Sequence, residues 1–169
     1  IYLIASARKN QHSKIAFEGS LEHVVTNPSH DEILLPYKGM TISFNPSTHQ
    51  PNWVAWELLA SETDGESNRE SNFSTDYEVK GCANTDDYRG SGYDRGHMAP
   101  AGDMKWNAET MRESFLMTNI CPQAGDLNRG AWKKLEEKCR QRAVADSAVV
   151  IVCGPIFTPG EGVERIGKT

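Results

Sequence analysis

The chain has 169 residues, of which 18 are Lys or Arg and 23 are Asp or Glu, so its formal net charge is −5. That length fits about one domain, and we expect a single domain over residues 1–169. An apolar content of 38% with 14 glycines excludes a disordered or collagen-like chain. The longest apolar stretch, residues 148–153, is far shorter than the roughly 20 residues of a membrane-spanning helix.

The first predicted elements are two strands. Residues 40–44 and 53–58 alternate between apolar and polar side chains, which is the pattern of half-buried strands. Residues 61–74 are rich in Ser, Asn and acidic side chains, and they predict a surface loop. Residues 146–153 form a β-branched run that ends at a Gly-Pro pair, which predicts a buried strand.

The clearest helix is predicted from Asn128, a good N-capping residue, to about Ala143. An apolar stripe at steps of four predicts its core face: Leu127, Ala131, Leu135, Cys139 and Ala143. A second stripe contains Asn128, Trp132, Glu136 and Arg140. Its polar members either meet a functional site or form an ordinary solvated face, and periodicity alone favours the solvated face. Strands and helices mixed in this way predict an α+β fold.

Charge is distributed unevenly along the chain. Residues 128–143 carry six basic side chains and two acidic ones, whereas residues 57–78 carry seven acidic side chains and one Arg. The basic helix could contact a polyanion, although such a charge run more often serves solubility. The acidic net charge argues against strong non-specific affinity for nucleic acid.

The four cysteines lack the C-x-x-C spacing of a structural zinc site. Cys139 and Cys153 lie in apolar patterns and are predicted to be buried thiols. Cys82 and Cys121 lie in loop-like sequence and could be bridged in an oxidising compartment. The sequence does not decide among the possible disulfide pairings of the four cysteines.

Residues 88–100 place three glycines, two arginines and His97 within one short segment. Glycines at this density predict a constrained turn that presents the histidine. The other four histidines lie in polar or turn-like sequence without such a context. Because an unperturbed imidazole has a pKa of about 6.5, His97 is a candidate general base.

Three ordered blocks carry a resemblance to a known family. They are Asp94-Arg-Gly-His-Met-Ala-Pro100, Thr118-Asn-Ile-Cys-Pro-Gln123 and Asp126-Leu-Asn-Arg-Gly-Ala-Trp132 with Leu135-Glu136. In these blocks the chain resembles the DNA/RNA non-specific endonucleases of the ββα-metal (His-Me finger) fold, which include the endonuclease G type. The match is continuous over residues 88–155 and weaker back to Trp53.

The resemblance implies a role for each matching residue. His97 would activate the attacking water, and Asn128 would be the single protein ligand of Mg²⁺, with Mn²⁺ or another divalent ion as alternatives. Glu136 lies eight residues further on, about 12 Å along a helix, so it would hold metal-bound water rather than the ion. Asn119 would belong to the polar network around His97, and Arg95 would position the phosphodiester.

Arg69 is the candidate for a further phosphate-binding arginine of the family. Each site residue also has a structural interpretation: Asn128 as an N-cap, Glu136 as a salt-bridge partner of Arg140, Asn119 as a turn residue and Arg95 as a surface charge. Their joint presence in three ordered blocks favours a site.

We therefore expect a magnesium-dependent, sugar-non-specific endonuclease that hydrolyses phosphodiester bonds of DNA and RNA through backbone recognition. The implied fold is α+β, a mixed or antiparallel sheet with helices around the ββα-metal site. One alternative is a catalytically inactive nuclease-like module that binds nucleic acid or a protein. Another is a phosphodiesterase that acts on small nucleotides.

The family pattern also sets expectations beyond the site. Relatives usually continue with further strands after residues 154–157, so we expect this chain to lack the C-terminal strands of the domain. It starts at Ile1 without a leader-like pattern, from which we expect that a preceding segment has been removed. The resemblance implies a secreted, periplasmic or cell-envelope protein. It does not decide whether the protein forms a homodimer.

Overall fold

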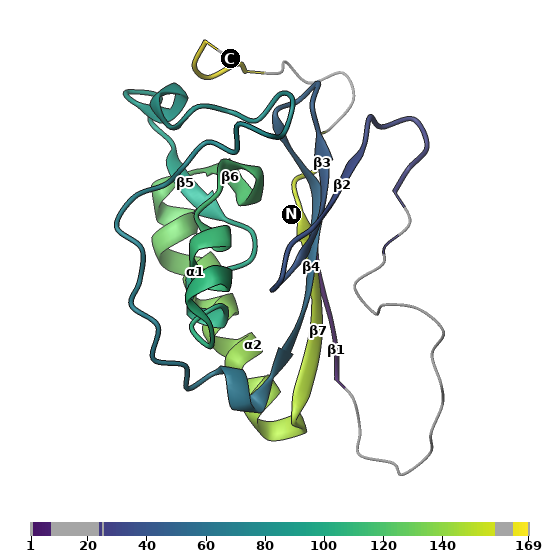
Figure 1. Ribbon diagram of the computed structural model, residues 1–169, viewed down its shortest axis with the longest axis vertical. Coiled ribbons are helices and arrows are strands. Elements are labelled where there is room, and N and C mark those ends of the chain that lie inside the picture. The colour runs from purple at the N-terminus through teal and green to yellow at the C-terminus, as the bar shows by residue number, and fades with distance from the viewer. Residues whose placement is uncertain (1, 8–23, 25, 158–163, 169) are drawn as a thin grey trace.

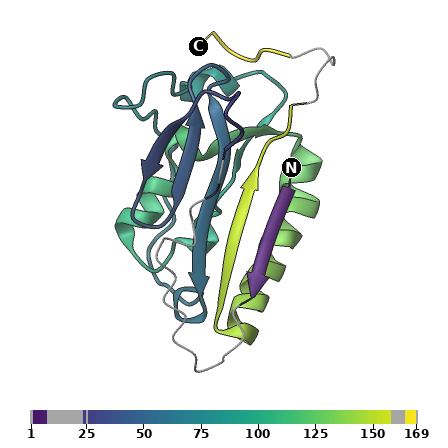
Figure 2. The same ribbon diagram turned by 90° about the vertical axis from the view of Figure 1, so that its right-hand side faces the viewer.

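A five-stranded antiparallel sheet forms one side of the molecule (Figures 1 and 2). The computed structural model describes residues 2–7, 24, 26–157 and 164–168. The strands, in sheet order, are β1 (Tyr2–Ala7), β7 (Ala148–Gly154), β4 (Gln50–Leu59), β3 (Thr41–Asn45) and β2 (Ile33–Pro36). Strand β7 pairs with β1 on one side and β4 on the other, so the last strand among the described residues lies inside the sheet.

The three strand predictions are confirmed as β3, β4 and β7. The alternation of β3 does not give an exposed face, because Ser43 is fully buried. Its hydroxyl accepts a hydrogen bond from Asn52 Nδ2 at 3.0 Å. A buried hydroxyl with a partner avoids the desolvation penalty of an unpaired one. The polar segment that was predicted as a loop begins with the 3₁₀ turn η1 (Ala60–Glu62) and is otherwise irregular.

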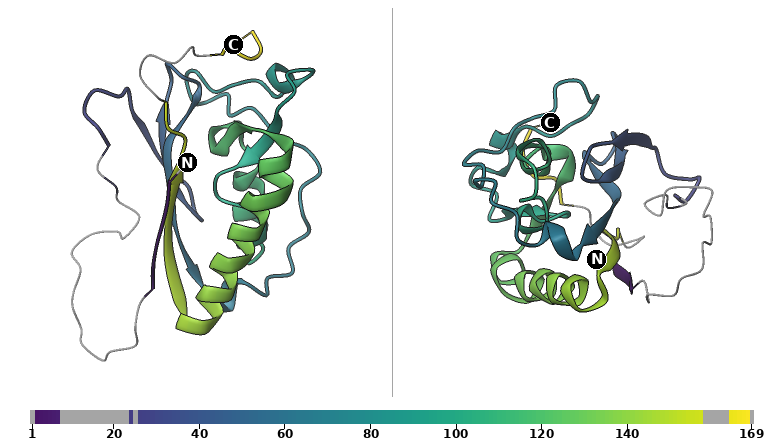
Figure 3. Two further views of the ribbon diagram at one scale, coloured as in Figure 1. Left: turned by 180° about the vertical axis from the view of Figure 1, so that it is seen from behind. Right: turned by 60° about the horizontal axis from the view of Figure 1, so that its bottom comes forward.

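The second layer contains the two-stranded antiparallel sheet of β5 (Asp94–His97) and β6 (Ile120–Gln123) and the helices α1 (Ala108–Ser114) and α2 (Lys133–Asp146). Three short 3₁₀ turns connect these elements: η2 (Thr85–Tyr88), η3 (Ala101–Asp103) and η4 (Met117–Asn119). Helix α2 runs along the sheet and contacts β7, β4 and β1 (Figure 3). Within the described residues, no helix has the length and apolarity needed to cross a bilayer.

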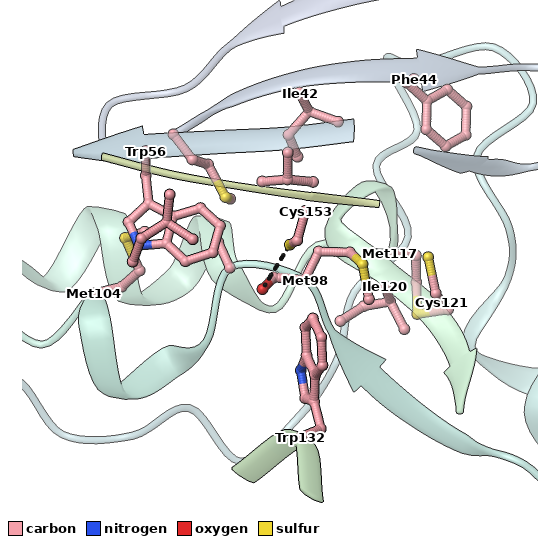
Figure 4. Packing of buried hydrophobic residues seen from close by; sticks show 14 of the residues in the cluster. Ile42, Phe44, Trp56, Met98, Met104, Met117, Ile120, Cys121, Trp132 and Cys153 are labelled. Atoms are coloured by element: carbon pink, nitrogen blue, oxygen red, sulfur yellow. Dashed lines mark hydrogen bonds between the residues drawn. The ribbon is translucent and has the colours of Figure 1, made fainter. Parts of the chain in front are cut away.

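The hydrophobic core fills the space between the two layers. Ile42, Trp56 and Cys153 extend from the large sheet, and Met98 and Trp132 come from the opposite layer (Figure 4). The Cys153 thiol donates to the Met98 carbonyl at 3.4 Å, directly across the interface. Because Met98 follows His97, the core fixes the backbone on which the candidate base is mounted.

The predicted helix differs from the observed one in its first turns. Residues Leu127–Trp132 form a π-helix, η5, before α2 begins. A π-helical turn contains an additional residue, which rotates the side chains that precede it relative to a continuous α-helix. The stripe prediction is therefore right for Cys139 and Ala143, which are buried, and wrong for Leu127 and Ala131, which are exposed.

All four cysteines lie in the described part of the chain, and all four are buried free thiols. We predict that unreduced protein in denaturant reacts with four equivalents of a thiol reagent such as DTNB. The native protein should react slowly, because each side chain is at most 7% exposed and burial raises the pKa of Cys82 to about 11. Recovery of only two equivalents from the denatured protein would show that a disulfide exists.

Candidate active site

The His97 segment is built by the pairing of β5 with β6. His97 lies opposite Ile120 in the register, and Gly96 lies opposite Cys121. A Cβ atom at Gly96 would lie 2.2 Å from the Gln123 side chain, so any other residue here would have to displace this buried side chain. Gly90 and Gly92 serve the predicted turn instead, because both have positive φ values that disfavour other residues.

Two contacts fix η5 against β5. Trp132 Nε1 donates to the His97 carbonyl at 3.0 Å, and Asn128 Nδ2 donates to Asp94 Oδ2 at 3.0 Å. Arg129 adds an ion pair with the same carboxylate at 2.7 Å. The first and last residues of β5 are thus held to opposite ends of η5. This arrangement places the candidate base and the candidate metal ligand on one rigid unit.

The side-chain amide of Asn128 has a defined orientation. Its backbone N–H donates to Ala124 O at 2.9 Å as in a helix interior, so the N-cap interpretation of this residue is wrong. An ionised carboxylate accepts hydrogen bonds but cannot donate them, so the NH₂ group of Asn128 must be the part of the amide that faces Asp94. The amide oxygen therefore points away from Asp94 and is left for another partner.

A cleft of about 800 Å³ lies beside this unit. Its lining comes from the loop after β4, from β5 and the segments on either side of it, and from η5 and α2. The lining residues are Arg69, Phe73, Tyr88, Tyr93, Asp94, Arg95, His97, Pro100, Ala101, Gly102, Asn128, Arg129, Lys133, Glu136 and Arg140. Five of the six predicted site residues meet here, and Asn119 does not. The polar stripe of the helix also meets the cleft, so the solvated-face interpretation of that stripe is wrong.

The His97 ring is packed between two aromatic rings. The Phe73 ring centroid lies 5.2 Å away, and Phe115 presents an edge-to-face contact at 4.8 Å. His97 is 8% exposed, and its Nε2 atom is buried without a hydrogen-bond partner in the described part of the chain. Burial, followed by the nearby Arg69 charge, lowers the pKa of His97 to about 3. The imidazole is therefore neutral near pH 7.

Two arginines flank the aromatic pair. The Arg69 guanidinium lies 5.0 Å above the Phe115 ring, and the Arg95 guanidinium lies 5.4 Å above the Phe73 ring. Arg95 also donates from Nε and one terminal nitrogen to the Thr85 carbonyl, at 3.3 and 3.0 Å. Its position is thus fixed by backbone, whereas Arg69 reaches the cleft from an exposed loop.

Asn119 is fully buried, and its side chain is saturated by backbone groups. Its Oδ1 accepts from Ala99 N–H, and its Nδ2 donates to the carbonyls of Ala99 and Ser114, each at 2.9 Å. Both N–H groups of the side chain are therefore used, and no donor is left for a phosphate. It holds the segment that follows His97, which fits the predicted place of Asn119 in the polar network around the histidine.

Glu136 does not form the predicted salt bridge with Arg140. Arg140 pairs instead with Asp103 at 2.7 Å, so that interpretation of Glu136 is wrong. Burial raises the pKa of Glu136 to about 7, and the Arg140 charge opposes that rise. Within the described residues, no group of three or more His, Cys, Asp and Glu side chains could hold a metal ion. A bound ion would thus depend on an amide oxygen, water and ligand atoms.

Sequence reasoning missed several residues of this site. Asp94 was part of the first block but carried no predicted role, and only its contact with Asn128 reveals one. Phe73 and Phe115 are far from His97 in sequence, and no spacing rule brings them together. For Arg140, the polar helix stripe was a usable signal.

The low pKa of His97 has a consequence for stability. Between about pH 6.5 and pH 3 the unfolded chain binds a proton at this residue and the folded chain does not, so stability should fall as the pH falls, by at most about 1.4 kcal/mol per pH unit. Urea unfolding of His97→Gln at pH 7 and pH 5 should show a smaller loss than wild type. The exposed His30→Gln is the control. An equal loss in wild type and His97→Gln would contradict the buried neutral imidazole.

Comparisons with known proteins agree with this geometry. Residues 18–168 match the family model described as DNA/RNA non-specific endonuclease. The mitochondrial nuclease EXOG of Danio rerio is 39% identical over 126 residues, which are 73% of this chain and 37% of the relative. A nuclease of Nostoc is 38% identical over 74% of this chain and 46% of its own length. Bovine mitochondrial endonuclease G is 36% identical over 70% of this chain and 40% of its own length.

A solved structure shows the same fold. The crystal structure of the EndoG/EndoGI complex, described as showing the mechanism of EndoG inhibition, matches with a TM-score of 0.71 and 30% identity. The match covers 76% of this chain and 55% of that chain. This chain thus spans about half or less of the length of these relatives. The animal relatives are named mitochondrial, which differs from the expected export. From the family match over most of its length, the chain belongs to the DNA/RNA non-specific endonucleases.

Proposed function

We propose that this chain forms the catalytic site of a metal-dependent endonuclease that hydrolyses phosphodiester bonds in DNA and RNA. The observation that carries the proposal is the meeting of a neutral histidine, a free amide oxygen and five cationic side chains in one cleft. The cations are Arg69, Arg95, Arg129, Lys133 and Arg140. On a chain with a net charge of −5, this local concentration of positive charge matches a polyanionic ligand.

Recognition through the backbone follows from the kinds of side chain in the cleft. Guanidinium groups bind phosphate oxygens with directional, charge-assisted hydrogen bonds, and these contacts carry no base information. Arg69 reaches from the loop after β4, and Arg95 from β5. They approach the cleft near His97 from different elements, so a phosphodiester between them would lie next to the imidazole.

The residues present fit a divalent cation of the magnesium type. Mg²⁺ prefers oxygen ligands, keeps several waters and takes one or two protein ligands together with phosphate oxygens. The amide oxygen of Asn128 supplies such a ligand, because Asp94 holds the NH₂ group on the other side. Asn128 would hold the ion, which when bound would stabilise negative charge on the phosphate and on the leaving oxygen.

His97 would accept the proton of the attacking water. Its Nε2 atom is enclosed in the protein, which leaves Nδ1 as the ring nitrogen for proton transfer in the cleft. The low pKa of the free protein keeps the imidazole unprotonated and ready to accept. A bound phosphodiester anion would favour the imidazolium that forms, because an opposite charge nearby raises a histidine pKa.

Glu136 would accept hydrogen bonds from water in the cleft and balance its positive charge. Its carboxylate lines the same cleft as Asn128, but from the next turns of the helix. No ion pair of Glu136 is present within the described residues, so the group is available to solvent-borne donors. A cation in the cleft would also favour its ionised form, since burial otherwise raises its pKa to about 7.

The proposal predicts that His97→Gln removes cleavage. Supercoiled plasmid and single-stranded RNA should both be cut by wild type in Mg²⁺ and not in EDTA. The variant should lose at least about 10²-fold in rate, because general base catalysis contributes that much or more. Gel assays with His30→Gln as the matched control measure this. Wild-type rates in folded His97→Gln would remove His97 from the base role, and binding without cutting by wild type would favour the inactive module.

Substitution of Asn128 should change the metal requirement. Asn128→Ala removes the proposed oxygen ligand, so the Mg²⁺ concentration for half-maximal cleavage should rise at least about 10-fold and the maximal rate should fall. Asn27→Ala is the control, because this exposed asparagine does not line the cleft. A magnesium titration of Asn128→Ala that overlays that of wild type would show that the ion binds elsewhere.

A further inference from the structure

Asp103 is a buried carboxylate outside the blocks that define the site. Its side chain is 0% exposed, and both oxygens have partners. Oδ1 accepts from an Arg140 terminal nitrogen at 2.7 Å, and Oδ2 accepts from Trp56 Nε1 at 3.1 Å. Trp56 belongs to β4 of the large sheet, and Arg140 belongs to α2. Asp103 therefore links the sheet to the helix through one charged group.

Arg140 combines this buried anchor with a position on the cleft. Its side chain is 24% exposed and lines the cleft with Glu136. Gly102, which precedes Asp103, lies directly against the guanidinium: a Cβ atom at Gly102 would be 2.9 Å from the same terminal nitrogen that Asp103 binds. The guanidinium is thus held on one side by a charge and on another by close contact with backbone.

Glu136 is the competing partner for Arg140. It lies four residues earlier on the same helix, and acidic and basic side chains at that spacing commonly pair. The observed partner is nevertheless Asp103. Without Asp103, Arg140 would be available to pair with Glu136, and pairing would neutralise both groups at the cleft.

We infer that Asp103 is a positioning residue that seats Arg140 as a fixed cation for the substrate's phosphate groups and keeps it from pairing with Glu136. This inference rests on the proposed function, because it assumes a phosphate-containing ligand. It explains why a carboxylate with a desolvation cost is kept in the core, beside a tryptophan N–H that satisfies its second oxygen. It also gives a reason for the glycine at position 102, where a Cβ atom would lie 2.9 Å from the guanidinium.

Asp103→Asn tests whether the negative charge of Asp103 is needed to seat Arg140. In EDTA, the affinity for a single-stranded DNA oligonucleotide should fall about 10-fold or more, as expected for loss of a charged hydrogen bond that orders a ligand group. In Mg²⁺, KM should rise and kcat should fall. Asp146→Asn is the matched control, since Asp146 pairs with Arg142 on the same helix but outside the cleft. Unchanged affinity and KM in folded Asp103→Asn would overturn the inference.

A double-mutant cycle separates positioning from structural support. If Asp103 acts through Arg140, Asp103→Asn should weaken DNA binding no further in an Arg140→Gln background. Full additivity of the two losses would show that Asp103 acts independently of Arg140, and it would refute the inference. Thermal unfolding of each variant reports its folded fraction.

Gly102→Ala gives a second test that leaves the charges intact, for the case in which Asp103→Asn does not fold. The added methyl group should displace the guanidinium and reduce affinity several-fold in wild type, but have little effect in Arg140→Gln. An equal effect in both backgrounds would contradict the seating of Arg140. If wild type binds DNA without cutting it, the nuclease proposal fails, whereas the binding comparisons still decide the role of Asp103.

Discussion

The attachment of η5 to β5 at both ends is the constraint on which the site depends. Trp132 is tied to the backbone carbonyl of His97, and Asn128 is tied to the side chain of Asp94. A helix packed only by apolar contacts could slide or rotate by small amounts. Two directional hydrogen bonds, about one π-helical turn apart, remove that freedom, and they fix the histidine relative to the asparagine amide.

The electrostatics of the cleft are local and do not follow the charge of the whole chain. The protein is acidic overall, yet cationic side chains surround a histidine that stays neutral because it is buried between Phe73 and Phe115. Burial acts in the same way on Glu136, whose carboxyl is driven towards its neutral, protonated form. The free site thus holds a neutral imidazole and a readily protonated carboxyl; a bound phosphate would favour the imidazolium, and a bound cation would favour the carboxylate.

Much of the fold and part of the site could be predicted from the sequence, because some patterns depend only on neighbouring residues. The alternation of apolar and polar residues predicted β3 and β4, and a β-branched run predicted β7. The three sequence blocks predicted His97, Arg95, Asn128 and Glu136 as site residues, and all four line the cleft. The π-helical turn could not be predicted from apolar residues spaced four apart, because a π-helix has a longer repeat. Leu127 and Ala131, which belong to that stripe, are exposed as a result.

The remaining site residues depend on contacts between segments that are distant in sequence. The partner of Arg140 is Asp103 rather than its helical neighbour, and the backbone groups held by Asn119 lie up to 20 residues away. Arg69 was a candidate from the family resemblance, but only the packing of its surface loop against the second layer brings it to the cleft. No local pattern encodes such pairs, because they arise when the two layers pack together.

The most direct test of this account is the position of a divalent cation in the cleft. Crystals soaked in Mn²⁺ should give an anomalous difference peak beside the side-chain oxygen of Asn128, with no second protein atom in direct contact. A peak on the carboxylates of Asp103 or Glu136 instead, with none at Asn128, would contradict the arrangement of base and metal ligand on which the proposed function rests.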